Sequence, residues 1–120
     1  MIYHVVPLAE WTADPGRPYA PASLADDGFV HCSPDEATAL AVAGAFYRAA
    51  PRPLAVLVVD EHRLTAPCRW EAPDPAPPHG VPDGTLFPHV HGPLDREAVV
   101  RVLRVRWDGR DRPVDLAPPD

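Results

Sequence analysis

The chain has 120 residues, a length typical of one small domain with its own hydrophobic core. Its formal net charge of -6 argues against an extended nucleic-acid surface or a membrane-binding surface, since either needs a basic face. All eleven cationic side chains are arginine, and the absence of lysine excludes Schiff-base chemistry. We therefore expect a single domain over residues 1–120 with one binding site.

The two cysteines, Cys32 and Cys68, stand far apart and form no CxxC pattern, which is typical of reduced thiols rather than of a zinc or redox motif. The first residues lack the basic region and apolar stretch of a secretory signal. No segment reaches the ~20 apolar residues that cross a bilayer. We expect a cytoplasmic protein without a membrane partner.

Short elements are predicted in the first part of the chain. Ile2 to Val6 is rich in β-branched residues and is followed by Pro7, which predicts a strand. Leu8 to Thr12 predicts a helical turn. Ala22 to Asp26 predicts a short helix that ends at Gly28.

A helix-start signal follows a predicted strand from Phe29 to Cys32. Ser33, Pro34 and Glu36 match the N-cap, the first helical position and the third helical position of a capping box. This pattern predicts a helix that runs to about Ala49. We expect the cap to be structural, because the acidic residues beside it repel anions.

The second half of the chain is predicted to be mostly strands. Leu54 to Asp60 is almost entirely apolar, which predicts a central strand buried on both faces. Further strands are predicted at Cys68 to Glu71, Leu86 to His91 and Val99 to Trp107. The short and mostly non-alternating elements favour an α+β fold over a doubly wound sheet.

The segment from Ala72 to Gly84 contains five prolines and two glycines. Proline at this density excludes a helix or a central strand. The segment is also longer than an ordinary connection, so it is predicted to be either a lid over a site or a flexible excursion.

Histidine occurs in three apolar segments, IYHVV, GFVHCS and FPHVHG. Successive side chains of a strand point to opposite faces, so His31 shares a face with Phe29, and His89 and His91 share a face with Phe87. The phenylalanines would close the inner end of each strand and the histidines would lie nearer the mouth. The pattern predicts that His31 and His89 face one cleft.

Alternative interpretations of these histidines remain open. His89 and His91 form an HxH pair that would hold a metal ion together with His4 or His31. No third ligand lies at a fixed spacing, and a single histidine more often has a structural role, with a ring nitrogen bonded to backbone or carboxylate.

Arg69 and Glu71 share one face of their predicted strand. Glu71 is a candidate to orient a histidine or to act as a general base. The other interpretation is a surface salt bridge, which contributes about 0–1 kcal/mol.

The motifs IYHVV, EW, GFVHCS, RWE and FPHVHGPL, in this order and spacing, resemble the bacterial family known as domain of unknown function 952. The resemblance extends from Ile2 to about Trp107. That family is similar in fold to the ADP-ribosyltransferase superfamily, which includes RNA 2′-phosphotransferases and binds NAD or an ADP-ribosylated intermediate. The resemblance implies two small, mostly antiparallel sheets that form a cleft, with one main helix.

The resemblance also implies a ligand, which is NAD or an ADP-ribose-like nucleotide bound without a required metal, and a transfer of ADP-ribosyl or phosphoryl groups. His31 and His89 would orient ribose hydroxyls or phosphate, Arg69 or Arg63 would supply positive charge, and Glu71 would stabilise charge at C1 of the ribose. The implied catalytic residues are His31, Glu71 and His89, and the implied ligand-binding residues are His4, Ser33, Arg69 and His91. The alternative function is a sensor module that binds a metal or small ligand without turnover.

Overall fold

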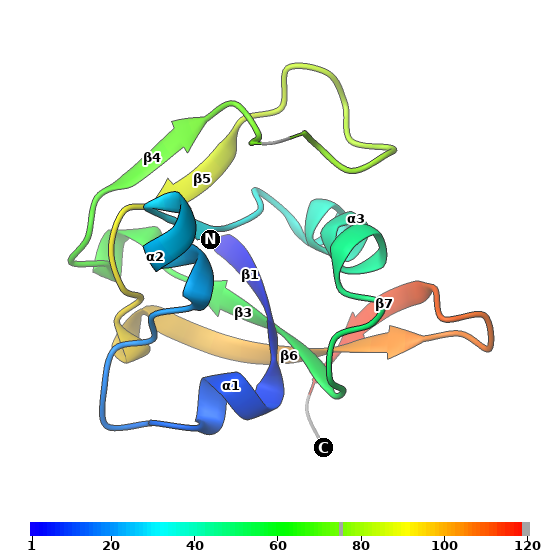
Figure 1. Cartoon of the computed structure of the whole chain (residues 1–120), viewed down its shortest axis with the longest axis horizontal. Coiled ribbons are helices and arrows are strands. Elements are labelled where there is room, and N and C mark those ends of the chain that lie inside the picture. Colours follow the sequence, from blue (N-terminus) through cyan, green and yellow to red (C-terminus); the bar gives the residue numbers. More distant parts are fainter. Residues whose placement is uncertain (75, 119–120) are drawn as a thin grey trace.

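The computed structural model describes residues 1–74 and 76–118, which form two antiparallel sheets and a few helices (Figure 1). One sheet has the strand order β1-β3-β6-β7 and the other has the order β2-β5-β4. The strands are β1 (Ile2–Pro7), β2 (Val30–His31), β3 (Leu54–Val59), β4 (Cys68–Glu71), β5 (Phe87–Val90), β6 (Val99–Trp107) and β7 (Pro113–Ala117). The helical elements are α1 (Leu8–Thr12), α2 (Ala22–Asp27), α3 (Glu36–Phe46) and the 3-10 turns η1 (Glu61–Arg63) and η2 (Arg96–Ala98). The predicted α+β fold with two antiparallel sheets is confirmed.

Strand β3 lies inside the four-stranded sheet, between β1 and β6. All six of its residues are buried because the apolar run LAVLVV packs on both faces. Val56 and Val58 pack with residues of α3, whereas Leu57 and Val59 belong to a second core cluster on the other face. The prediction of a central strand buried on both faces is confirmed.

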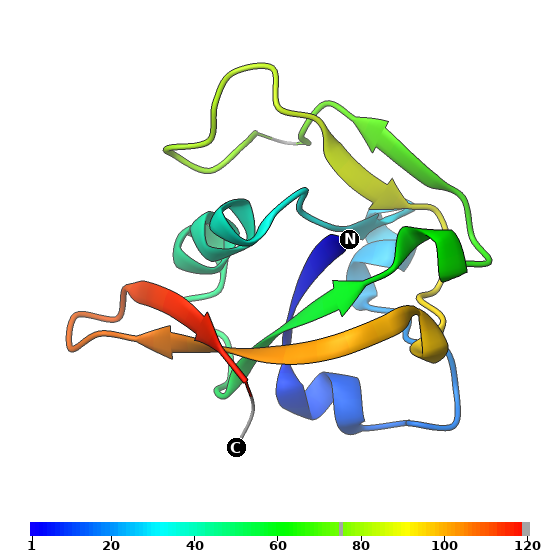
Figure 2. The same cartoon turned by 180° about the vertical axis from the view of Figure 1, so that it is seen from behind.

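The three-stranded sheet shares that second cluster. Val30 of β2 and Val90 of β5 are direct cross-strand partners, and both are fully buried beside Ile2 and Leu57. Since side chains alternate along a strand, the opposite face of β2 and β5 carries His31 and His89. Figure 2 shows this sheet at the opposite end of the molecule from the β6–β7 hairpin.

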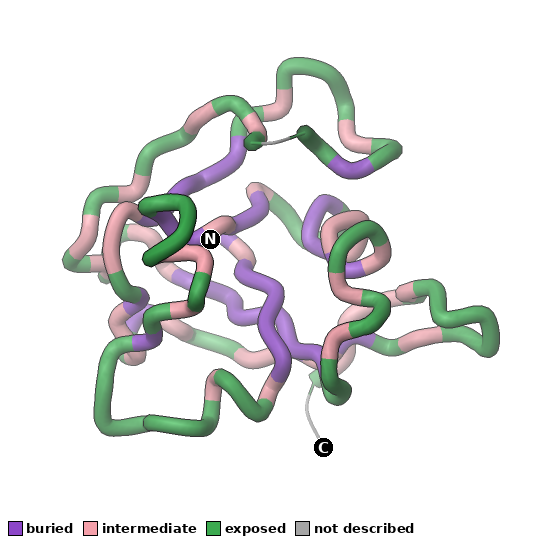
Figure 3. Tube along the Cα trace, in the orientation of Figure 1, coloured by how far each residue is buried: buried purple, intermediate pink, exposed green. Residues whose placement is uncertain are grey.

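Burial is concentrated in β1, β3 and the inner face of the three-stranded sheet, while the turn between β6 and β7 is exposed (Figure 3). The core therefore supports β2 and β5 from one side and leaves their other side for a site.

The start of α3 differs from the prediction. The helix begins at Glu36, and its N-cap is Asp35, whose Oδ1 accepts a hydrogen bond from the backbone N–H of Thr38 at 2.7 Å. Ser33 instead exchanges two backbone hydrogen bonds with Tyr3, at 2.6 and 3.0 Å. The predicted capping box at Ser33 is wrong because this pairing with β1 keeps Ser33 in extended backbone.

Other element boundaries also differ. Helix α3 ends at Phe46 rather than at Ala49, and β2 contains two residues rather than the four predicted. Strand β7 is not predicted by the sequence, because it is a short edge strand that begins with Pro113 and lacks a strong apolar pattern.

Candidate functional site

A cavity of about 510 Å³ lies between the three-stranded sheet and α3. The sheet contributes His31, His89 and Phe87, and the end of α3 contributes Phe46 and Tyr47. The proline-rich segment after β4 provides a third wall through residues 73–74 and 76–78. Figure 1 shows this segment above α3.

His31 and His89 are direct partners across the antiparallel β2–β5 pair. Their ring centroids lie 5.8 Å apart in an edge-to-face arrangement, and both rings line the cavity. The Phe29 ring stacks on the His89 ring, with 4.0 Å between the ring centroids, and its centroid lies 4.6 Å from that of His31. The structure thus places the two imidazoles on one wall, as strand alternation predicts, with Phe29 beside both.

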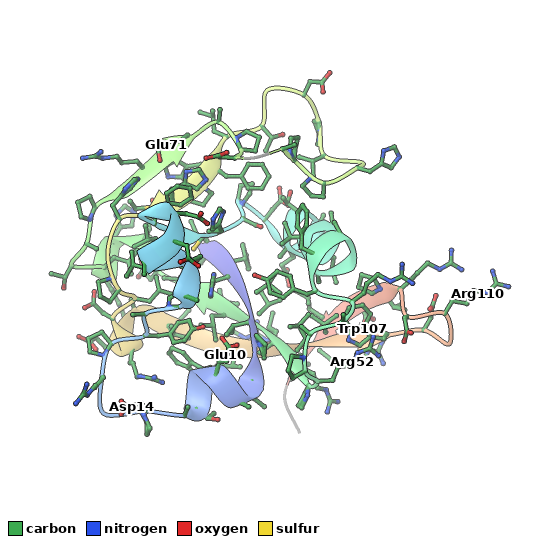
Figure 4. The ribbon with its side chains drawn as sticks, in the orientation of Figure 1. Glu10, Asp14, Arg52, Glu71, Trp107 and Arg110 are labelled. Carbon is green, nitrogen blue, oxygen red and sulfur yellow. The ribbon has the colours of Figure 1, made fainter. Side chains whose placement is uncertain are left out.

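Glu71 holds two imidazoles on one carboxylate oxygen. Its Oε1 accepts from Nδ1 of His89 at 2.9 Å and from Nε2 of His91 at 3.0 Å. The hydrogen bonds from His91 and His89 hold the pKa of Glu71 below its usual range, so the carboxylate stays ionised. Figure 4 shows Glu71 on β4, and its side chain is not part of the cavity lining.

Asp27 anchors the other cavity histidine. Its Oδ2 accepts from Nε2 of His31 at 2.8 Å. Asp27 is the last residue of α2, and Gly28 follows it with φ +85°, a left-handed conformation that favours glycine and turns the chain into β2. Asp27 could not be assigned to the site from the sequence. A spacing of four residues predicts a side-chain contact only within one helix, and α2 ends before His31.

His4 is buried and contacts the back of the site rather than the cavity. Its Nδ1 donates to the carbonyl oxygen of His31 at 2.7 Å. Burial lowers the pKa of His4 to about 4, although the hydrogen bond to His31 acts in the opposite direction. His4 is therefore neutral near pH 7, and the cavity lining does not include it.

The remaining predicted site residues occupy different places. Ser33 is buried and lines the cavity next to Cys32. Arg69 lies opposite His89 on β4 but is exposed and outside the lining. His91 is outside the cavity lining and contacts Glu71 and Phe29, the residues that also contact His89.

The described part of the cavity lining contains two carboxylates, Asp27 and Asp74, and no arginine. Arginine side chains instead gather near the β6–β7 hairpin. Figure 4 shows Arg52 beside Trp107 and Arg110 at the hairpin end, far from Glu71. The Arg52 guanidinium lies 4.0 Å from the centre of the Trp107 ring. His31 and His89 are therefore the basic side chains in the described part of the cavity lining.

The arrangement of side chains in residues 1–74 and 76–118 does not match a metal site. No three His, Cys, Asp or Glu side chains there are placed to hold one ion together. His89 and His91 share a carboxylate partner instead.

Two aromatic residues at the end of α3, Phe46 and the C-cap residue Tyr47, complete the site. Phe46 is exposed, and Tyr47 is half-buried. Burial raises the pKa of Tyr47, so its hydroxyl remains a hydrogen-bond donor at neutral pH. Phe46 and Tyr47 could not be assigned to the site from the sequence, since helical periodicity does not show which sheet the end of a helix faces.

A model of the family described as "protein of unknown function (DUF952)" matches residues 5–102. The chain belongs to the DUF952 family. The DUF952 match contains the cavity histidines His31 and His89 together with their anchors Asp27 and Glu71, and it leaves out β7.

Two crystal structures of protein CC0527 from Caulobacter crescentus are similar to this DUF952 chain. CC0527 is 28% identical, and a double mutant of it with two methionine substitutions is 27% identical. Each of the two structures gives a TM-score of 0.75, and each match covers 94% of this chain and 92% of the CC0527 chain. No curated protein matches the chain. Among the described residues, no helix is long and apolar enough to cross a membrane.

Proposed function

We propose that the cavity binds a nucleotide of the NAD or ADP-ribose class and that the domain is ADP-ribosyltransferase-like. The observation that carries this proposal is the pair of imidazoles from His31 and His89, 5.8 Å apart on one cavity wall and each hydrogen-bonded to its own carboxylate. Two oriented ring nitrogens beside a preformed cavity are typical of a small-molecule site.

The size and lining of the cavity support a ligand with both a ring and a polar part. About 510 Å³ lies within the roughly 300–1,000 Å³ of ordinary ligand pockets. Phe46, Tyr47 and Phe87 offer apolar and aromatic surface to a base, while His31 and His89 offer polar contacts to ribose or phosphate.

The roles in this proposal divide between contact and positioning. His31 and His89 contact the ligand, with Ser33 beside them on the wall. Glu71 and Asp27 act through the histidines, because each carboxylate fixes one ring. A transfer of an ADP-ribosyl or phosphoryl group would use the same histidines, and we propose a cytoplasmic setting, with which the free thiols of Cys32 and Cys68 agree.

Isothermal titration with ADP-ribose and with NAD tests the proposal. His31→Ala and His89→Ala should each weaken binding at least about tenfold, since each removes one oriented hydrogen bond to the ligand in a partly buried site. His62→Ala is the matched control, because His62 is an exposed histidine of η1 outside the cavity lining.

The double variant His31→Ala, His89→Ala tests whether the two rings bind one ligand together or make independent contacts. If both rings bind one ligand, the losses in His31→Ala and His89→Ala should be coupled rather than additive. Absence of binding of both ligands to the folded wild type would reject the proposal. Equal losses in His62→Ala would reject the cavity as the place of binding.

A further inference from the structure

The tip of the β6–β7 hairpin presents an arginine to solvent. Residues 108–112 of this turn are all exposed, and Figure 4 shows Arg110 at the outer end of the hairpin. Arg112 pairs with Asp108, whereas the guanidinium of Arg110 makes no ion pair or hydrogen bond within the part of the chain that the structure describes. Arg110 is therefore a cation that is available to a partner molecule.

Several hydrogen bonds hold this turn in one conformation. Oδ1 of Asp108 accepts from the backbone N–H of Arg110 at 2.8 Å and from that of Arg112 at 3.0 Å. Arg48, which follows α3, donates to the carbonyl oxygen of Asp111 at 3.1 Å and to that of Arg110 at 3.4 Å. Because the turn is already ordered, a contact made through Arg110 costs little conformational entropy.

This end of the molecule has a charge opposite to that of the whole chain. Residues 106–115, together with Arg48 and Arg52, contain five arginines and three aspartates, an excess of two positive charges. The formal net charge of the chain is -6, so the remaining residues have an excess of eight negative charges. Such a separation of charge favours contact between the unlike ends of two molecules.

The cavity carries negative charge that matches Arg110. Its described lining contains Asp27 and Asp74 and no arginine. Asp27 uses Oδ2 on Nε2 of His31, which leaves its Oδ1 without a hydrogen bond to a described residue. Asp74 is exposed and likewise makes no ion pair or hydrogen bond among the described residues. Both carboxylates therefore have acceptor oxygens for a cation from outside.

We propose that Arg110 of one copy docks onto the carboxylates of Asp27 and Asp74 of a second copy, so that the cavity receives a residue from its partner. A planar guanidinium has five N–H donors, which suits two carboxylates at once. The hairpin extends beyond α3 in Figures 1 and 2, so its tip can reach a neighbouring molecule. The backbone of Arg110 keeps its hydrogen bond to Asp108, and the side chain alone makes the contact.

Two such contacts around a two-fold axis close a dimer in which each copy gives a hairpin and receives one. The inference goes beyond the proposed function, because the contact between copies stands whichever ligand the cavity binds. Pairing of two β7 edges fits a dimer less well. Strand β7 has five residues, begins with Pro113 and is followed by Pro118, and proline donates no backbone hydrogen bond to a neighbouring strand.

Sedimentation velocity of the full chain over a series of protein concentrations tests the proposal. Wild type should form a dimer. Arg110→Glu and Asp74→Arg should each raise the dissociation constant at least about tenfold, because like charges then meet in both contacts. Arg17→Glu and Asp14→Arg are matched controls with the same changes of charge, since these two exposed residues pair with each other outside the hairpin and the cavity lining. Both controls should associate as wild type does.

An equal mixture of Arg110→Glu and Asp74→Arg chains gives the sharpest result. In a mixed dimer the new glutamate of one chain meets the new arginine of the other, and the unchanged Arg110 and Asp74 meet in the second contact. The mixture should associate about as tightly as wild type, although neither variant does so alone. If both variants are folded by circular dichroism and their mixture is no tighter than either alone, the proposal is wrong.

The remaining outcomes also decide the question. Wild type that stays monomeric throughout the series, or a dimer that survives both substitutions, would overturn the proposal. Binding of single-stranded RNA by a monomeric protein, lost in Arg110→Glu, would assign the hairpin to nucleic acid instead. Dimers that bind neither ADP-ribose nor NAD would reject the nucleotide proposal alone, whereas binding of ADP-ribose by a monomeric wild type would reject the association alone.

Discussion

The buried imidazole of His4 donates from Nδ1 to the carbonyl oxygen of His31 at 2.7 Å, and this hydrogen bond joins β1 of one sheet to β2 of the other. The carbonyl belongs to the residue whose side chain lines the cavity. The position of the His31 ring therefore depends on a neutral histidine in the core as well as on Asp27.

The burial of His4 predicts a specific loss of stability in acid. Burial lowers the pKa of His4 from 6.5 to about 4, so the unfolded chain binds the proton more tightly than the folded chain does. The stability contributed by neutral His4 is complete above pH 6.5 and is lost as the pH falls through about 4. The maximum loss is roughly 3 kcal/mol, and urea unfolding at a series of pH values measures it.

His4→Asn is the variant that isolates this effect. Asparagine can place its amide N–H near the His4 Nδ1 position, and it does not titrate. The difference in unfolding free energy between wild type and variant should change across this pH range. A constant difference between pH 7 and pH 4 would show that His4 does not carry the effect.

A second prediction concerns the N-cap of α3. Asp35→Ala should lower the free energy of unfolding by about 1 kcal/mol, because it leaves the backbone N–H of Thr38 without its partner. Ser33→Ala should leave the cap intact, since Ser33 pairs with Tyr3 through its backbone. Urea denaturation measures the free energy of unfolding of both variants. A larger loss of stability in Ser33→Ala than in Asp35→Ala would contradict the assignment of Asp35 as the N-cap.

The contrast between Ser33 and Asp35 shows which features of the fold can be predicted from the sequence. Local signals predicted β3, β6 and α3, because a buried apolar run and a proline-marked helix start depend on near neighbours. The same signals placed the cap at Ser33, since the choice between Ser33 and Asp35 depends on pairing with Tyr3, far away in the chain. The alternation rule likewise put His31 and His89 on one wall, but it had no means of finding Asp27.

A third prediction tests Glu71 as the residue that positions His89 and His91. Glu71→Gln should release one or both rings, because an uncharged amide oxygen is a weaker acceptor than a carboxylate. We expect weaker ligand binding and altered ring nitrogen-15 signals of both histidines. Glu61→Gln is the matched control, since Glu61 accepts from the exposed Trp70 ring at 3.1 Å and lies outside the cavity lining. Unchanged signals in Glu71→Gln would show that the carboxylate does not hold the rings.

A fourth prediction concerns the thiols. Burial raises the pKa of Cys68 to about 11 and that of Cys32 further, and the thiolate is the reactive form. Both thiols should react slowly with a disulfide reagent at neutral pH. The reaction of Cys68 should become faster as the pH approaches 11. Cys32 should react only on unfolding. Fast labelling of Cys32 in the folded protein at neutral pH would contradict its burial at the cavity wall.

A titration of ADP-ribose into nitrogen-15-labelled protein tests whether the histidine-bearing cavity is the ligand site. We expect backbone amide shifts concentrated at His31, His89 and Tyr47, with little change at Arg110, which Figure 4 places at the far end of the molecule. Saturating shifts confined to the β6–β7 hairpin, or no shifts at any concentration, would contradict it.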